Sequence, residues 1–127
     1  MSVMGPNRTA KLIPVMTRIF RVVVRGHFHG LDAEQRERLR AAAGDYEIFK
    51  AAYTRDGTLT YEPNLVAFSF RYELRDTDYP PAEAEARVVE IALAKARESL
   101  AIMGVDHRHL RATATDMATV WAPGDEE

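Results

Sequence analysis

The sequence contains no cysteine, which excludes disulfide bridges, thiol nucleophiles and Cys-ligated metal sites. It also lacks any run approaching the roughly 18 apolar residues that a membrane-spanning helix requires. An excess of positive charge is missing too, because the formal net charge is -2 at pH 7. A protein that binds nucleic acid or an anionic membrane through its overall charge would need that excess. We therefore expect a cytoplasmic protein with no membrane partner, no nucleic-acid partner and no cofactor.

Length and composition indicate one globular domain with a real core. The chain has 127 residues, of which 46% are hydrophobic and 28% charged. Residues 1–15 show no hydrophobic periodicity and are predicted to be a disordered extension. Met16 lies directly before the first predicted strand and is a candidate start of translation. The domain is expected to cover residues 16–121, and the acidic residues 122–127 are expected to form a frayed tail.

Apolar and polar residues alternate along the strand predicted at residues 18–28. Successive side chains of a strand point to opposite faces, so each set forms a surface. The same alternation recurs in the strands predicted at residues 65–75 and 108–119. The apolar set comprises Phe20, Val22, Val24 and Phe28, then Val66, Phe68, Phe70, Tyr72 and Leu74, then Leu110, Ala112 and Ala114. A sheet with one core face and one open, polar face follows.

Two helices are predicted between these strands. Asp32 is a good N-cap, and Gln35 completes a capping-box pattern for a helix that ends at Gly44. The second helix begins at Pro80 and Pro81. Its apolar stripe is centred on Val89, Ala92, Leu93, Ala96, Leu100 and Met103, and Gly104 ends it.

A second strand is predicted at residues 46–55, with Phe49 on its core side. Asp56 and Gly57 then favour a type I′ turn into a third strand. Pro63 interrupts that strand at residues 62–64, where we expect a bulge, because proline cannot donate to a ladder.

The order of elements is therefore strand, helix, strand, strand, helix, strand. This order predicts the α+β, ferredoxin-like βαββαβ fold. In that fold a four-stranded antiparallel sheet with strand order 4-1-3-2 carries both helices on one face.

Arginine and threonine gather on the open face of the predicted sheet. If Arg25 lies across from Arg111 in this strand order, the two repel unless an anion or a carboxylate lies between them. Guanidinium groups suit the paired oxygens of carboxylates and phosphates, so a ligand clamp is one interpretation. The other is a solvated face with internal salt bridges. The candidate ligand-binding residues are Arg21, Arg25, Arg71, Arg111, Thr113 and Thr115.

Histidine and aspartate supply further candidates. The first and last strands are neighbours, so alternation brings the four histidines to one end of the open face, as a weaker alternative metal site. These are His27, His29, His107 and His109. Surface histidines near strand ends are also common. Asp116 has the parity of the apolar set, and we expect it to cap a helix or a loop, or to act as an acid or base.

From Met16 onward the chain resembles a family of short actinobacterial proteins of unknown function. The resemblance is carried by residues 20–26, 30–31, 56–61, 67–71 and 110–117. It implies a small, stand-alone bacterial domain without an assigned activity. The arginines, the threonines and Asp116 fall within the pattern, whereas the histidines do not.

The leading hypothesis is a ligand-binding or interaction protein, forming a homodimer, whose open face holds a small anion or a partner chain. The alternative is a cofactor-independent enzyme of small-molecule metabolism that resembles dimeric α+β barrel proteins, such as a monooxygenase, isomerase or cyclase. The sequence does not decide whether the protein is an enzyme.

Overall fold

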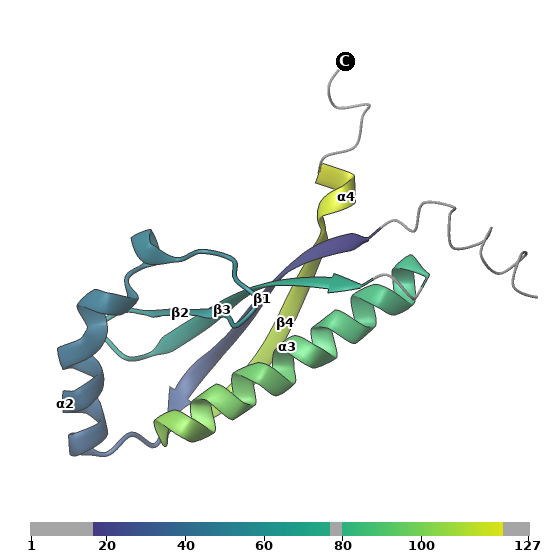
Figure 1. Cartoon of the computed structure of the whole chain (residues 1–127). Helices are drawn as coiled ribbons and strands as arrows, with labels where there is room; N and C mark the ends of the chain where they lie inside the picture. Colours follow the sequence, from purple (N-terminus) through teal and green to yellow (C-terminus); the bar gives the residue numbers. More distant parts are fainter. Residues whose placement is uncertain (1–16, 77–79, 121–127) are drawn as a thin grey trace, which may run out of the picture.

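A computed structural model describes residues 17–76 and 80–120, and the predicted extension and tail lie outside these residues. Its elements are β1 (Arg18–His29), α2 (Ala33–Ala42), the 3-10 helices η1 (Ala43–Tyr46) and η2 (Ile48–Lys50), β2 (Thr58–Tyr61), β3 (Ala67–Asp76), α3 (Pro81–Met103), β4 (Asp106–Asp116) and α4 (Met117–Val120). The predicted α+β class is confirmed: the four strands form one antiparallel sheet, and α3 crosses one of its faces (Figure 1).

The strand order β2-β3-β1-β4 is the order 4-1-3-2 read from the opposite edge of the sheet. The prediction is corrected in the residues of its second strand, which is Thr58–Tyr61 and not residues 46–55. The strand predicted at residues 58–75 divides into β2 and β3, which pair with each other. The expected bulge at Pro63 is therefore a reversal of the chain. Leu65 N donates to Glu62 O at 2.9 Å, Val66 N donates to the Asn64 side chain at 3.1 Å, and Leu65 has a left-handed φ of 57°.

Residues 46–55 are not a strand. They contain η2 and end in a single parallel bridge between Thr54 and Tyr72. The predicted hairpin turn at Gly57 is replaced by a turn in which Gly57 N donates to Thr54 Oγ1 at 2.9 Å. Gly57 has φ of +93°, and a Cβ there would overlap the Tyr72 ring. Phe49, expected in the core, is 92% exposed.

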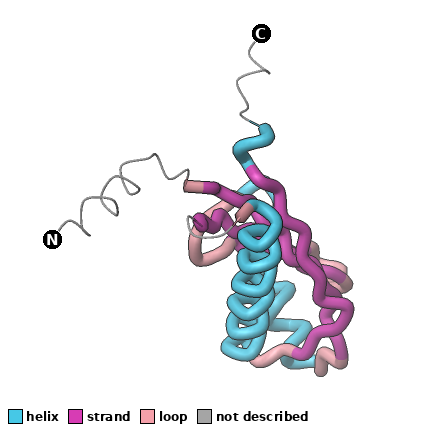
Figure 2. The backbone as a smooth tube through the Cα atoms, turned by 90° about the vertical axis from the view of Figure 1, so that its right-hand side faces the viewer, coloured by secondary structure: helices cyan, strands magenta, loops and turns pink. Residues whose placement is uncertain are grey.

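The core lies between the sheet and α3, which form two layers (Figure 2). The fully buried line of α3 repeats every four residues and consists of Ala84, Val88, Ala92, Ala96 and Leu100. The predicted stripe is thus rotated, because Val88 faces the sheet while Val89 is only partly buried. Val66 is 56% exposed, since β3 begins after it and Leu65 occupies the buried place instead.

Helix α2 lies at one end of the sheet (Figure 1). Its predicted capping box is confirmed, because Asp32 and Gln35 exchange two hydrogen bonds of 2.7 Å. The Gln35 side chain also donates to Gly104 O at 2.7 Å and so ties α2 to the end of α3. Gly44 does not end α2 in a left-handed conformation, since the chain continues into η1. Gly104 does end α3 in this way, with φ of 73°.

Strand β4 forms an edge of the sheet and contains a bulge. Its register against β1 shifts between Arg25 and His27. His109, in the shifted segment, has φ of 60°, which is unusual for a residue with a side chain. The strand ends at Asp116, earlier than the predicted residue 119, because α4 begins at Met117.

Candidate functional site

The register arranges the side chains of the open face in three rows across the strands. The first row holds Arg21, Glu73 and Thr115; the second holds Val23, Arg71 and Thr113; the third holds Arg111, Arg25, Ser69 and Thr60. All six predicted ligand-binding residues therefore lie on this face, divided among the rows. Rows are about 7 Å apart along the strands, so each provides its own chemical environment.

The first two rows are occupied by interactions within the chain. Arg21 Nε lies 3.5 Å from Glu73 Oε1, and its guanidinium carbon lies 4.8 Å from the centre of the Tyr53 ring. In the second row Arg71 Nη1 donates to Thr60 Oγ1 at 3.3 Å. These contacts match the interpretation of an open face with internal pairing.

The third row differs because two like charges face each other. Arg25 and Arg111 are direct partners across β1 and β4, which is the condition under which the sequence predicts their repulsion. Arg111 Nη1 donates to His109 O at 3.1 Å, whereas Arg25 makes no hydrogen bond or ion pair with any described residue. Partners of this kind have Cβ atoms about 5 Å apart, so their charges repel. Such a row is complementary to an anion.

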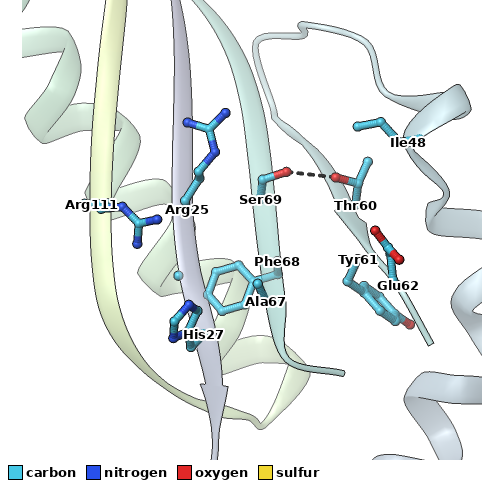
Figure 3. A pocket seen from close by; sticks show the side chains of 11 residues that line it. Arg25, His27, Ile48, Thr60, Tyr61, Glu62, Ala67, Phe68, Ser69 and Arg111 are labelled. Carbon is cyan, nitrogen blue, oxygen red and sulfur yellow. Dashed lines mark hydrogen bonds between the residues drawn. The ribbon is translucent and has the colours of Figure 1, made fainter. Parts of the chain in front are cut away.

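A hollow of about 300 Å³ lies over the third row, and we call it the Arg25–Arg111 hollow. Figure 3 shows Arg25, Arg111 and His27 on one side and Ile48 and Glu62 on the other. Between the two sides the Thr60 and Ser69 hydroxyl oxygens are hydrogen-bonded at 2.8 Å. The remaining lining residues are Gly26, Tyr61, Ala67 and Phe68. Small-molecule sites begin at about this volume.

The bulge in β4 changes the expected arrangement of the histidines. It places Arg108 opposite His27 and His107 opposite Phe28, so His107 turns toward the core side, where its Nδ1 is buried without a partner among the described residues. His109 instead reaches His27, with ring centres 5.3 Å apart.

The four histidines therefore do not converge, since His29 pairs with Asp106 at the end of the ladder. Across residues 17–76 and 80–120, no group of three or more His, Asp or Glu side chains is placed to hold a metal ion. His27 is the histidine that lines the Arg25–Arg111 hollow.

Asp116 has a structural environment away from this hollow. Its Oδ2 lies 3.0 Å from Arg18 Nη1, and its Oδ1 accepts a 2.9 Å hydrogen bond from Ala118 N at the start of α4. It lies five positions along β4 from Arg111, a distance of about 17 Å. This is the capping role that its position in the sequence suggested.

The sequence identified only part of the hollow. Thr113 and Thr115 lie on the open face but do not line it. Ser69 and Thr60 do line it, and the alternation that placed Ser69 on the polar face was the available signal. Glu62 and Ile48 were missed, because one lies in the unexpected reversal and the other in the 3-10 helix that replaces the predicted strand.

A second hollow, of about 400 Å³, lies beside β3. It is lined by Thr54, Arg55, Glu73, Leu74, Arg75 and Lys95, and so includes none of the predicted site residues. Its carboxylate, Glu73, is already paired with Arg21.

Fold and site together define a small α+β domain whose open sheet face carries a hollow lined by Arg25 and Arg111. The chain belongs to a family of unknown function (DUF6204), whose profile matches residues 15–123. No curated protein and no solved structure matches the chain. None of the helices in the described part of the chain is long and apolar enough to cross a membrane.

Proposed function

We propose that this protein binds a small anionic molecule through its carboxylate or phosphate group in the Arg25–Arg111 hollow. The observation that carries the proposal is the direct pairing of Arg25 with Arg111 on adjacent strands, with no described acidic side chain bonded to Arg25. An anion between the two guanidinium groups replaces repulsion by two charge-assisted contacts. Each such hydrogen bond contributes about 1.5–3 kcal/mol.

The hydroxyl pair adds a further donor to the hollow. Thr60 Oγ1 accepts from Arg71 Nη1 and shares a hydrogen bond with Ser69 Oγ, in which either oxygen can be the donor. Whichever hydroxyl accepts in that bond keeps its own proton for another acceptor. One hydroxyl of the third row can therefore donate to an anion held by the arginines.

Titration of the full chain with benzoate and with inorganic phosphate, followed by ¹⁵N-¹H NMR, tests the proposal. Amide signals of residues lining the hollow should shift, and Arg25→Gln or Arg111→Gln should weaken binding at least tenfold. Arg97→Gln, an exposed charge change on α3, is the matched control and should bind as the wild type does. Absence of any shift, or undiminished binding by Arg25→Gln, would contradict the proposal.

Stability measurements separate a binding role from a folding role. Because Arg25 and Arg111 repel each other, removing one charge should leave the free energy of unfolding unchanged or raise it slightly. A loss of affinity without a loss of stability is therefore expected of Arg25→Gln. Destabilisation equal to the loss of affinity would instead assign Arg25 to the fold.

We also propose that the protein forms a homodimer and that it is located in the cytoplasm. The support for the homodimer is apolar surface near the hollow: Ile48 lines the hollow and is 55% exposed, and its neighbour Phe49 is 92% exposed. Exposed apolar side chains of this kind are typical of interaction surfaces, and two-fold dimers are the commonest assembly. Native mass spectrometry should detect a dimer that Phe49→Ser weakens, whereas Ile102→Ser, at another highly exposed apolar position, on α3, should leave it intact.

The enzymatic alternative, a cofactor-independent monooxygenase, isomerase or cyclase, has less support. Its acid or base candidates are Asp116 and a histidine. Asp116 bonds to Arg18 and to the start of α4, about 17 Å along the strand from Arg111, and His27 is the histidine that lines the hollow.

A further inference from the structure

We infer that the ligand carries a hydrogen-bond donor, an amine or a hydroxyl, at the end opposite its acidic group, and that the Glu62 carboxylate accepts from it. The inference rests on the proposed function, because it takes the acidic group of the ligand to lie between Arg25 and Arg111. It adds the chemical class: an amino acid or hydroxy acid whose two polar groups are separated by an apolar body.

The hollow has opposite charges on opposite sides. Arg25 and Arg111 come from β1 and β4, while Glu62 directly follows β2 on the other side of β3 (Figure 3). Neighbouring strands are about 4.8 Å apart, so the backbones of β1 and β2 are separated by about 10 Å. A single charged group of a small ligand can contact either the two arginines or Glu62, but not both. A small ligand that contacts both sides therefore needs two polar groups.

The Glu62 side chain, like that of Arg25, has no bonded partner among the described residues. This side chain is exposed and forms no hydrogen bond or ion pair with any residue in the described part of the chain, although the Glu62 backbone carbonyl accepts from Leu65 N. Arg25 and Glu62 both line the hollow without pairing with each other. Two unpaired charges of opposite sign on facing sides form a template for a molecule with an anionic end and a donor end.

The space between the charges is lined by apolar residues and, in the third row, by the Ser69–Thr60 hydroxyl pair. Ala67 and Phe68 lie at its centre, and Ile48 and Tyr61 lie on the side of Glu62 (Figure 3). Glu62 lies two residues beyond Thr60, which is in the row of Arg25, so it is displaced from Arg25 by about 7 Å along the strands as well as about 10 Å across them, about 12 Å in all. If a hydrogen bond of about 3 Å is subtracted at each end, about 6 Å remains between the polar groups of the ligand. The separation is larger when the hydrogen bonds lie above the sheet. One aromatic ring or a short aliphatic chain fills that length.

Glu62 also acts against other anions. A dicarboxylate, or a phosphate that extends across the hollow, would bring a second negative charge to the Glu62 carboxylate, and the two would repel. Glu62 would therefore select between ligands that the arginines hold equally well.

Three probes that share one ring test the inference: benzoate, 4-(aminomethyl)benzoate and terephthalate. Their dissociation constants are measured by NMR titration on the full chain and on Glu62→Gln, Arg25→Gln and the control Glu85→Gln, an exposed acid of α3. The wild type should bind 4-(aminomethyl)benzoate at least fivefold more tightly than benzoate. It should bind terephthalate most weakly of the three probes, because Glu62 repels the second carboxylate of that molecule. Glu62→Gln should remove the preference for the amine and strengthen terephthalate binding, with benzoate unchanged.

The failures of the two proposals are distinguishable. If Arg25→Gln weakens all three probes but the wild type shows no preference for the amine, or if Glu62→Gln keeps that preference, the role of Glu62 is refuted and the anion site stands. If no probe binds, or if Arg25→Gln binds them all as the wild type does, the anion site is refuted and the role of Glu62 with it. Glu85→Gln must behave as the wild type, since a general effect of charge would alter both acidic variants equally.

Discussion

Replacing Gly57 by alanine tests how the chain packs before β2. Gly57 and Gly30 both have positive φ angles, of 93° and 60°. A Cβ at Gly30 would meet nothing within 4 Å, whereas a Cβ at Gly57 would overlap Cε1 of the buried Tyr72 ring and lie 2.7 Å from its Cζ. Gly30→Ala is therefore a matched control that reproduces the backbone strain without the steric overlap.

The two variants should differ in the free energy of unfolding. A left-handed conformation costs alanine about 1–2 kcal/mol, of which about 0.4–1 kcal/mol is offset by the smaller entropy of the unfolded chain. Gly30→Ala should therefore lose about 1 kcal/mol. Gly57→Ala adds an overpacking cost of about 1–3 kcal/mol, because the Tyr72 side chain is fully buried. The total expected for Gly57→Ala is about 2–4 kcal/mol.

Urea unfolding followed by circular dichroism measures both losses. At roughly 4–8 °C per kcal/mol, thermal unfolding should show the gap as well. If Gly57 instead occupied a two-residue hairpin turn, its substituent would point to solvent and the two variants would be equally destabilised. Equal losses would therefore refute the packing described here. In a Tyr72→Leu background the extra cost of Gly57→Ala should disappear, which identifies the ring as its cause.

Three further changes have definite expected outcomes. Burial raises the pKa of Tyr72 to about 12, above the ordinary value of 10.0, so the stabilisation it reflects is complete below pH 10 and is lost as the pH rises toward 12. Tyr72→Phe should remove that alkaline loss and, because the hydroxyl has no described hydrogen-bond partner, should stabilise the fold by about 1 kcal/mol near neutral pH in urea titrations; an unchanged alkaline loss would contradict this. Asp116→Ala should cost about 1–2 kcal/mol, from its Arg18 pair and the N–H of Ala118, with benzoate affinity unchanged in NMR titration; reduced affinity would return Asp116 to the site. Gln35→Ala breaks the capping box and the tie to α3, so hydrogen exchange should speed up by about fivefold or more in α2 and far less in β1.

Alternation along strands is the part of the sequence that predicted the structure best. It separated the core face of β1 from the open face, and it placed Arg25 and Arg111 on the same open face. The start of α2 after Asp32 and the end of α3 at Gly104 were also predicted from the sequence, because capping depends on a few local residues. These features share a short range: each is decided by residues within a few positions or by a strict two-residue period.

Features that depend on contacts between residues far apart in the sequence could not be predicted from it. Residues 46–55 have apolar residues at strand-like spacing, but β3 uses its edge there for one bridge to Thr54, and Gly57 packs against the Tyr72 ring. The arrangement of the histidines depended on one extra residue in β4, which exchanges the two faces beyond it. No glycine marks that bulge, since His109 itself takes the positive φ angle. Glu62 and Ile48 entered the hollow through these same unpredicted segments.

The bulge at His109 also bears on how copies of this chain associate. An edge strand as long as β4 offers a row of backbone N–H and C=O groups on which another strand can pair, and uncontrolled pairing leads to aggregation. The extra residue interrupts this row, so the edge is divided into two shorter runs, and the exposed Arg108 and Arg111 add like charges on either side of the interruption. A neighbouring strand would have to match that kink in order to add to the sheet. The same irregularity that turns His107 inward thus protects the edge and leaves the open face as the surface for specific contact.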